Sequence, residues 1–169
     1  EAARRNLTLM VDHTFVYTGA VQKIREVIDT GRLGDVYYYD STRVNLGLFR
    51  RDVNVIWDLA VHDFAIMDYL LAASPVAISA SAASFVPDSQ DNMAHLSVYF
   101  DTGAMAHLSV SWLAPVKVRQ TLIGGSRQMV IYDDMQTSEK VKVYDRGVAV
   151  SDDPNTAHDQ MISYRLGEM

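Results

Sequence analysis

Asp58 and His62 are the two residues of this sequence whose types and spacing point most directly to chemistry. A carboxylate and an imidazole at positions i and i+4 share one face of an α-helix and can touch, and this contact orients a histidine for proton transfer. Histidine has an unperturbed pKa of about 6.5, so it accepts and returns protons near neutral pH. The spacing alone also fits an ordinary surface pair, and both interpretations stay open at this point.

Several other polar residues come just before this pair and are candidates for binding a substrate. Arg43 and Asn45 end an expected strand, so they could contact substrate hydroxyl groups or a phosphate. Arg50 and Arg51 could do the same from the loop that follows, and solvated arginines are the alternative. The planar guanidinium suits a diphosphate because it makes paired hydrogen bonds.

A metal site near His62 would have to recruit Asp63, Asp68 or His13. Two adjacent candidate ligands on a helix are too common to indicate one, so we expect no bound metal. The chain has no cysteine. This excludes disulfides and thiolate metal sites and fits a reducing, cytoplasmic location.

The Asp58 and His62 pair is expected on a helix over residues 54–71, where apolar residues recur three or four positions apart. Asp52 is the expected N-cap of this helix. A strand over residues 8–17, a helix over 20–30 ending at Gly31, and a strand over 35–45 come before it. From Pro75 the period changes to two, which predicts successive strands at residues 76–86, 94–100, 104–112, 119–123, 127–132 and 140–145.

This order of elements predicts an α+β fold, with an open, mainly antiparallel sheet and helices packed on one face. Asp101, Thr102 and Gly103 are expected to turn a hairpin, and Gly124 with Gly125 another turn. Residues 151–159 are expected to form a loop. The hairpin strands carry apolar residues on one face and short polar residues on the other, which is either solvated or packed against another sheet across a subunit interface.

Composition excludes two classes of partner. The 15 basic and 21 acidic residues give a net charge of −6, so strong nucleic-acid binding, which needs a basic face, is not expected, although small local basic groups stay open. The longest apolar region, residues 70–86, is interrupted by Pro75 and serines and does not predict a membrane span. The 169 residues fit one domain with a proper core.

Three segments in the same order resemble the glucose-fructose oxidoreductase, inositol dehydrogenase and rhizopine-catabolism (Gfo/Idh/MocA) family. They are residues 11–23, the turn at 31–36, and Trp57-Asp58-Leu59-Ala60-Val61-His62-Asp63. The resemblance covers nearly all of residues 7–167 and is to the second half of such proteins. It implies the C-terminal α+β domain that follows an N-terminal Rossmann domain for NAD(P).

The resemblance also implies roles for individual residues. His62 would take the hydroxyl proton of a sugar or cyclitol while the carbon gives hydride to the cofactor, and Asp58 would hold the substrate. Arg43 and Asn45 would bind substrate, since residues 43–49 are similar to members acting on nucleotide-linked amino sugars or on inositol. Trp57 would bind substrate as a sugar platform, although a tryptophan is more often core.

His13 and Tyr17 would reach the edge of the nicotinamide, although packing is an equal alternative for both. The glycine-rich dinucleotide fingerprint and the Glu-Lys-Pro motif of the family are absent from this sequence. The resemblance therefore implies that residues 1–17 end a preceding Rossmann domain and that the C-terminus is cut within the single domain 1–169. NAD or NADP would serve the full-length protein, with none bound to this chain, which alone would be inactive.

The expected partners are a small-molecule sugar or cyclitol and a second copy of the chain, in a homodimer or homotetramer built through the open sheet face. Three alternatives stay open. They are a non-catalytic interaction module that dimerises through its sheet, a relative that uses NAD to cleave glycosides, and a metal-dependent hydrolase.

Overall fold

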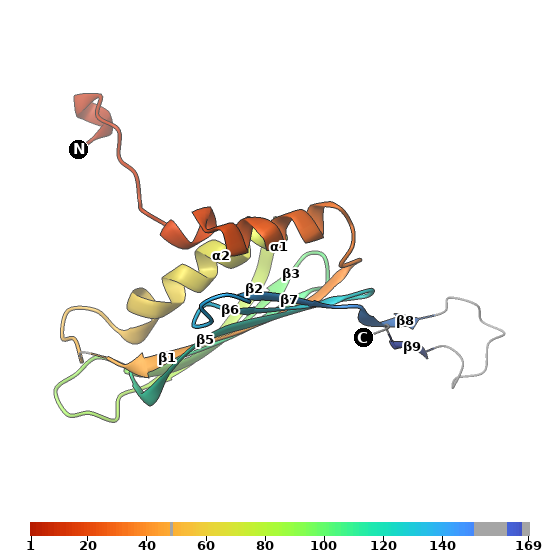
Figure 1. Ribbon diagram of the computed structural model, residues 1–169. Helices are drawn as coiled ribbons and strands as arrows, with labels where there is room; N and C mark the ends of the chain where they lie inside the picture. The colour runs from red at the N-terminus through yellow and green to blue at the C-terminus, as the bar shows by residue number, and fades with distance from the viewer. Residues whose placement is uncertain (48, 151–161, 167–169) are drawn as a thin grey trace.

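The computed structural model describes residues 1–47, 49–150 and 162–166 (Figure 1). The chain forms a seven-stranded sheet with two α-helices, and a separate two-stranded antiparallel sheet of β8 and β9. The elements are η1 (Ala3–Arg5), η2 (Thr14–Tyr17), α1 (Gly19–Asp29), β1 (Val36–Leu46), η3 (Ile56–Ala60), α2 (Val61–Leu71), β2 (Pro75–Ala83), β3 (Met93–Phe100), β4 (Met105–Ser111), β5 (Leu113–Gly125), β6 (Met129–Asp133), β7 (Val141–Tyr144), β8 (Arg146–Val150) and β9 (Ile162–Leu166).

The strand order of the large sheet is β2-β3-β4-β1-β5-β6-β7. The first strand of the chain, β1, lies at the centre, where it pairs parallel with β4 and antiparallel with β5. All other pairs in this sheet are antiparallel. Both α-helices lie over one face (Figure 1). The predicted α+β class with a mainly antiparallel open sheet is therefore confirmed. None of the described helices is long and apolar enough to cross a membrane.

The core lies between the helices and the sheet face they cover. Helix α1 buries Val21, Ile24 and Val27, and the side chains that β3 and β4 turn inward are buried as the period-two pattern predicts. Burying one aliphatic side chain of this size stabilises a fold by about 1.5–3 kcal/mol. This burial fixes the register of the strands, because a slip of one residue would turn every apolar side chain outward.

The other face of the sheet is open. Strand β2 is exposed along its whole length. His95 of β3 and His107 of β4 lie on this face with their rings stacked at a centroid distance of 5.8 Å. The polar, short-chained face predicted from the hairpin sequence is therefore uncovered in a single chain.

Of the three turns predicted at glycines, two are present in the structure and the third prediction is wrong. Gly31 after α1 and Gly103 in the β3–β4 hairpin have φ angles of +69° and +86°, the left-handed region that favours glycine. The turn predicted at Gly124 and Gly125 is wrong, because both residues belong to β5. A Cβ atom at Gly124 would overlap the ring of Tyr38, so this glycine allows close packing between strands.

The strand predicted over residues 8–17 is also wrong. Residues 7–13 form no strand and have no strand partner among the described residues, and Thr14–Tyr17 form the 3₁₀ turn η2. Leu9, Met10 and Val11 are exposed by 81%, 70% and 68%. β-branched and apolar side chains favour a strand only when neighbouring strands and a core receive them. The loop predicted at residues 151–159 lies outside the described residues.

Candidate active site

The helix that carries Asp58 and His62 begins with a π turn. In η3 the amide of Val61 donates to the carbonyl of Ile56, five residues back, and the α-helical pattern of α2 starts only after this turn. Single π turns inside helices are rare and are often found at functional sites. This one contains Asp58 and ends just before His62.

The start of the helix differs from the prediction. The side-chain oxygen of Asn54 accepts a hydrogen bond from the amide of Trp57 at 3.2 Å. Asp52 instead pairs with Arg50 at 2.8 Å. The Asp52 cap prediction is therefore wrong, because the helix starts too far along the chain for the side chain of residue 52 to reach its free amides.

The Asp58 carboxylate is held by a buried tryptophan. The indole Nε1 of Trp112, a side chain that is only 1% exposed, donates to Asp58 Oδ2 at 2.9 Å. Gly47 packs against this indole so closely that a Cβ atom there would lie 2.7 Å from Trp112 Cδ1. Arg50 Nη1 lies 3.9 Å from Asp58 Oδ1. The Asp58 side chain is still 33% exposed, so it is fixed but accessible.

His62 is half-buried, and its surroundings favour the neutral imidazole. Burial is the largest cause that lowers the pKa of His62 below its usual value, and the cations of Arg43 and Arg119 lower it further. The carboxylates of Asp63 and Asp58 oppose the shift. A neutral imidazole is the form that can accept a proton at neutral pH.

Asp58 and His62 do not make the contact that their spacing predicts. No hydrogen bond joins them in the described part of the chain, and Asp58 has the weakest influence on the pKa of His62. In a π turn, residues four apart no longer lie directly above one another as they do in an α-helix. The imidazole instead meets the edge of the Phe15 ring, with centroids 5.1 Å apart.

The three predicted substrate-binding residues differ in how far their side chains are exposed to solvent. Trp57 is 73% exposed and is not a core residue. Asn45 is half-buried near the end of β1. Arg43 is only 3% exposed, and its Nε and Nη2 bind the Asp63 carboxylate at 2.7 and 3.1 Å. Its Nη1 is buried and has no hydrogen-bond partner among the described residues.

His13 and Tyr17 come together in a cavity of about 450 Å³ between the N-terminal segment and α2. Val61, Ala65 and Asp68 of the helix also line it, but Asp58 and His62 do not. The predicted cofactor residues therefore reach α2 from the N-terminal segment, and the predicted catalytic residues do not line the same cavity. Among the described residues, no three histidine, aspartate or glutamate side chains gather as a metal ion would require.

The sequence analysis did not assign Phe15, Trp112 or Arg119 to the site, and it considered Asp63 only as a possible metal ligand. One of them left a signal in the sequence. Asp63 falls on the buried stripe of α2, three and four residues before Ile66 and Met67. A charged residue in an apolar stripe indicates a buried ion pair, because an unpaired charge there would be costly.

The comparisons with known proteins identify the class of domain. The sequence profile of the GFO/IDH/MocA C-terminal domain matches residues 21–131. The chain therefore belongs to the Gfo/Idh/MocA oxidoreductase family, of which it is a C-terminal domain. The resemblance found in the sequence is confirmed. No curated protein sequence matches the chain at a significant level.

Solved structures share the fold. UDP-N-acetylglucosamine 3-dehydrogenase GnnA from Acidithiobacillus ferrooxidans is 24% identical, with a TM-score of 0.70 over 85% of this chain and 46% of that one. A putative myo-inositol dehydrogenase from Sinorhizobium meliloti is 20% identical, with a TM-score of 0.70 over 85% and 49%. The WlbA dehydrogenase from Bordetella pertussis, in complex with NADH and UDP-GlcNAcA, is 15% identical, with a TM-score of 0.74 over 85% and 48%. The chain thus spans about half the length of these proteins.

Proposed function

We propose that this chain is the substrate-binding half of an NAD(P)-dependent oxidoreductase that acts on a hydroxyl group of a sugar, nucleotide sugar or cyclitol. Membership of the family supports the reaction class, and the substrates named for the similar structures support the substrate class. The observation that carries the proposal is the half-buried His62, whose lowered pKa leaves it neutral and ready to accept a proton.

In the proposed reaction, His62 takes the proton of the substrate hydroxyl group as a general base. Asp58, fixed by Trp112, orients the substrate from the preceding turn. A nicotinamide cofactor, when bound, supplies the acceptor for the hydride that leaves the same carbon. The products are a carbonyl compound, the reduced cofactor and a protonated histidine, which returns its proton to solvent.

The remaining site residues contribute binding. Trp57 offers an exposed indole face as a platform for a sugar ring, and Asn45 a hydrogen-bonding amide. Arg43 has only the buried Nη1 left for a substrate atom, so we expect its contribution to substrate binding to be small. His13 and Tyr17 would lie against the nicotinamide edge, and the cavity that they line fits such a role. NAD or NADP would be bound by the full-length protein and not by this chain alone, which we expect to be inactive.

The proposal also covers the position of this domain in the full-length protein and its assembly into oligomers. Residues 1–17 lead in from a Rossmann domain, and residues 1–169 act as one domain in a cytoplasmic enzyme. The open sheet face assembles two or four copies. That same uncovered face also fits the second candidate, a non-catalytic interaction module, because β2 is exposed along its whole length.

The test is His62→Ala in the full-length protein, assayed with UDP-N-acetylglucosamine or myo-inositol and NAD⁺ or NADP⁺. We expect turnover to fall by about 10² or more, the usual scale for a lost general base. His95→Ala, on the open sheet face, is the matched control and should leave turnover unchanged. A near wild-type rate for His62→Ala would remove His62 from the mechanism. If the wild-type protein turned over none of these combinations of substrate and cofactor, the interaction module would be favoured.

A further inference from the structure

A buried ion pair joins the central strand to the helix of the site. Arg43 of β1 binds the Asp63 carboxylate through Nε and Nη2 at 2.7 and 3.1 Å, and the two side chains are 4% and 2% exposed. Ser41 donates to the same carboxylate at 2.9 Å. Asp63 directly follows His62 in α2. The pair therefore fixes the first turn of α2 to the sheet.

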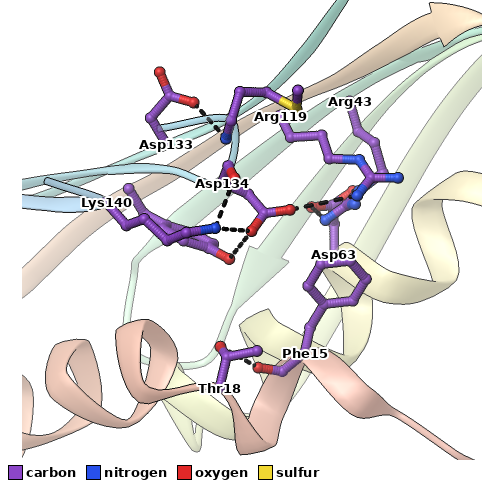
Figure 2. Close-up of polar contacts among 10 residues, drawn as sticks. Phe15, Thr18, Arg43, Asp63, Arg119, Asp133, Asp134 and Lys140 are labelled. Atoms are coloured by element: carbon purple, nitrogen blue, oxygen red, sulfur yellow. Dashed lines mark hydrogen bonds and ion pairs between the residues drawn. The ribbon is translucent and has the colours of Figure 1, made fainter. Parts of the chain in front are cut away.

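The Arg43 guanidinium also holds the ring that touches His62. Arg43 Cζ lies 4.7 Å from the centroid of the Phe15 ring, and Arg119 Cζ lies 5.7 Å from it. Asp134 holds Arg119 from the far side through a contact of 3.3 Å, and the Phe15 ring lies next to Arg43 and Asp63 (Figure 2). Cation–π attraction of this kind favours one placement of the ring.

These contacts form a closed chain around the imidazole. It runs from His62 to Phe15 at 5.1 Å, from Phe15 to Arg43, and from Arg43 to Asp63. Asp63 is joined to His62 by the backbone, which closes the chain. A buried ion pair is weak evidence for stability, because apolar residues of similar volume often stabilise as well. It does fix geometry, since a planar guanidinium binds a carboxylate in one orientation.

We propose that Arg43 is a positioning residue for His62, which it orients by holding the Phe15 ring against the imidazole and Asp63 against the sheet. The meaning of this arrangement for catalysis rests on the proposed function of His62. Arg43 itself does not touch His62 through a hydrogen bond. Its effect passes through Phe15 and through the helix backbone.

The first test is Arg43→Lys, which keeps the charge and removes the planar fork. In this chain, NMR should show nuclear Overhauser contacts between the ring protons of Phe15 and His62, and these should be lost in Arg43→Lys. Arg4→Lys is the matched control, because Arg4 pairs with Glu1 at 3.2 Å and its side chain is 81% exposed. If the contacts persist in a folded Arg43→Lys variant, Arg43 does not position the ring and the proposal is overturned.

Phe15→Ala keeps the proposal testable if Arg43→Lys does not fold. Removing the ring exposes the imidazole, so the pKa of His62, followed by NMR titration, should rise toward its usual value of about 6.5. Phe85→Ala is the control, since Phe85 is 65% exposed in a loop. An unchanged His62 titration in Phe15→Ala would mean that Phe15 does not cover the imidazole, which contradicts the proposal.

A kinetic measurement then separates this proposal from the proposed function. In the full-length protein, Arg43→Lys should lower kcat by about tenfold or more with little change in KM, because a small misplacement of a catalytic group is costly. If His62→Ala keeps full activity while the NMR contacts depend on Arg43, the function of His62 is wrong but its positioning stands. If His62→Ala is inactive and Arg43→Lys has normal kcat, the positioning proposal fails alone.

Discussion

At the scale of single residues, the site depends on side chains that hold other side chains. Trp112 lies at the end of β4 and fixes Asp58, which belongs to a turn far earlier in the chain. In a similar way, Arg43 holds the Phe15 ring, and this ring packs against His62. Proton transfer needs groups held at hydrogen-bonding distance and in the right orientation, and these supporting contacts supply that order.

The two tryptophans of the chain give a matched test of such support. Trp112→Phe removes the donor to Asp58 and some buried volume, so we expect the free energy of unfolding to fall by about 1.5–3 kcal/mol. Trp57→Phe makes the same change at a side chain that is 73% exposed, and it should stay within about 0.5 kcal/mol of wild type. Urea unfolding of this chain measures both values, and equal effects of the two substitutions would contradict a supporting role for Trp112.

The sequence identified Asp58 and His62 as candidates, but it could not predict how they are arranged. Their types and spacing are local information. The π turn that separates them and the Trp112 indole that binds Asp58 depend on the packing of β4 against the start of the helix. The position of Arg43 on a strand does not reveal that Asp63 accepts two of its hydrogen bonds.

At the scale of elements, α2 ends in an unusual way. Its C-cap residue, Ala72, has φ and ψ of 47° and 34°, which is left-handed. This conformation costs an alanine roughly 1–2 kcal/mol, and glycine adopts it without strain. Glycine at the end of a helix is therefore the more stable choice.

Ala72→Gly should raise the free energy of unfolding by about 0.5–1 kcal/mol, because the relief of strain exceeds the extra entropy of the unfolded chain. Ala65→Gly, in the interior of the same helix, should lower it by about 0.5–1 kcal/mol. Thermal or urea unfolding shows the sign directly. A destabilised Ala72→Gly variant would mean that the left-handed conformation carries no strain here.

Periodicity predicted most elements correctly, and the exceptions have a common physical cause. Helix α1, the β3–β4 hairpin and the inward faces of its strands follow from patterns within each segment. Residues 8–17 have a strand composition but no strand partner, and Gly124 has a turn composition but a packing role against Tyr38. In the first case no partner strand is present, and in the second the neighbouring side chain is remote in sequence, so a local pattern contains neither fact.

At the scale of the whole molecule, the open sheet face is the surface most suited to assembly. Tyr99 of β3, Met105 of β4 and Tyr38 of β1, which are neighbours across the sheet on this face, are 45%, 43% and 37% exposed. A large exposed apolar surface commonly marks a protein interface. A twofold axis on this face would bring the same strands of two copies together.

Ser97→Arg tests this assembly, because Ser97 lies on β3 between Ser79 of β2 and His107 of β4 on the open face. A buried, unpaired arginine on both sides of an interface is costly, so self-association should weaken by tenfold or more. Ser138→Arg, in the exposed loop between β6 and β7, is the control and should have no effect. Sedimentation equilibrium measures both, and unchanged association of Ser97→Arg would place the interface elsewhere.

The central position of β1 has a consequence for how the chain acquires its fold. β1 pairs with β4 and β5, so both of its edges find their partners only after most of the domain has been synthesised. The β3–β4 hairpin can close locally, but β1 must wait to be inserted beside it. Contacts between such distant segments slow folding, and an unpaired strand is open to wrong pairing meanwhile. The pairing of β1 is therefore expected to come late in folding, and Arg43 can reach Asp63 only when β1 is in place.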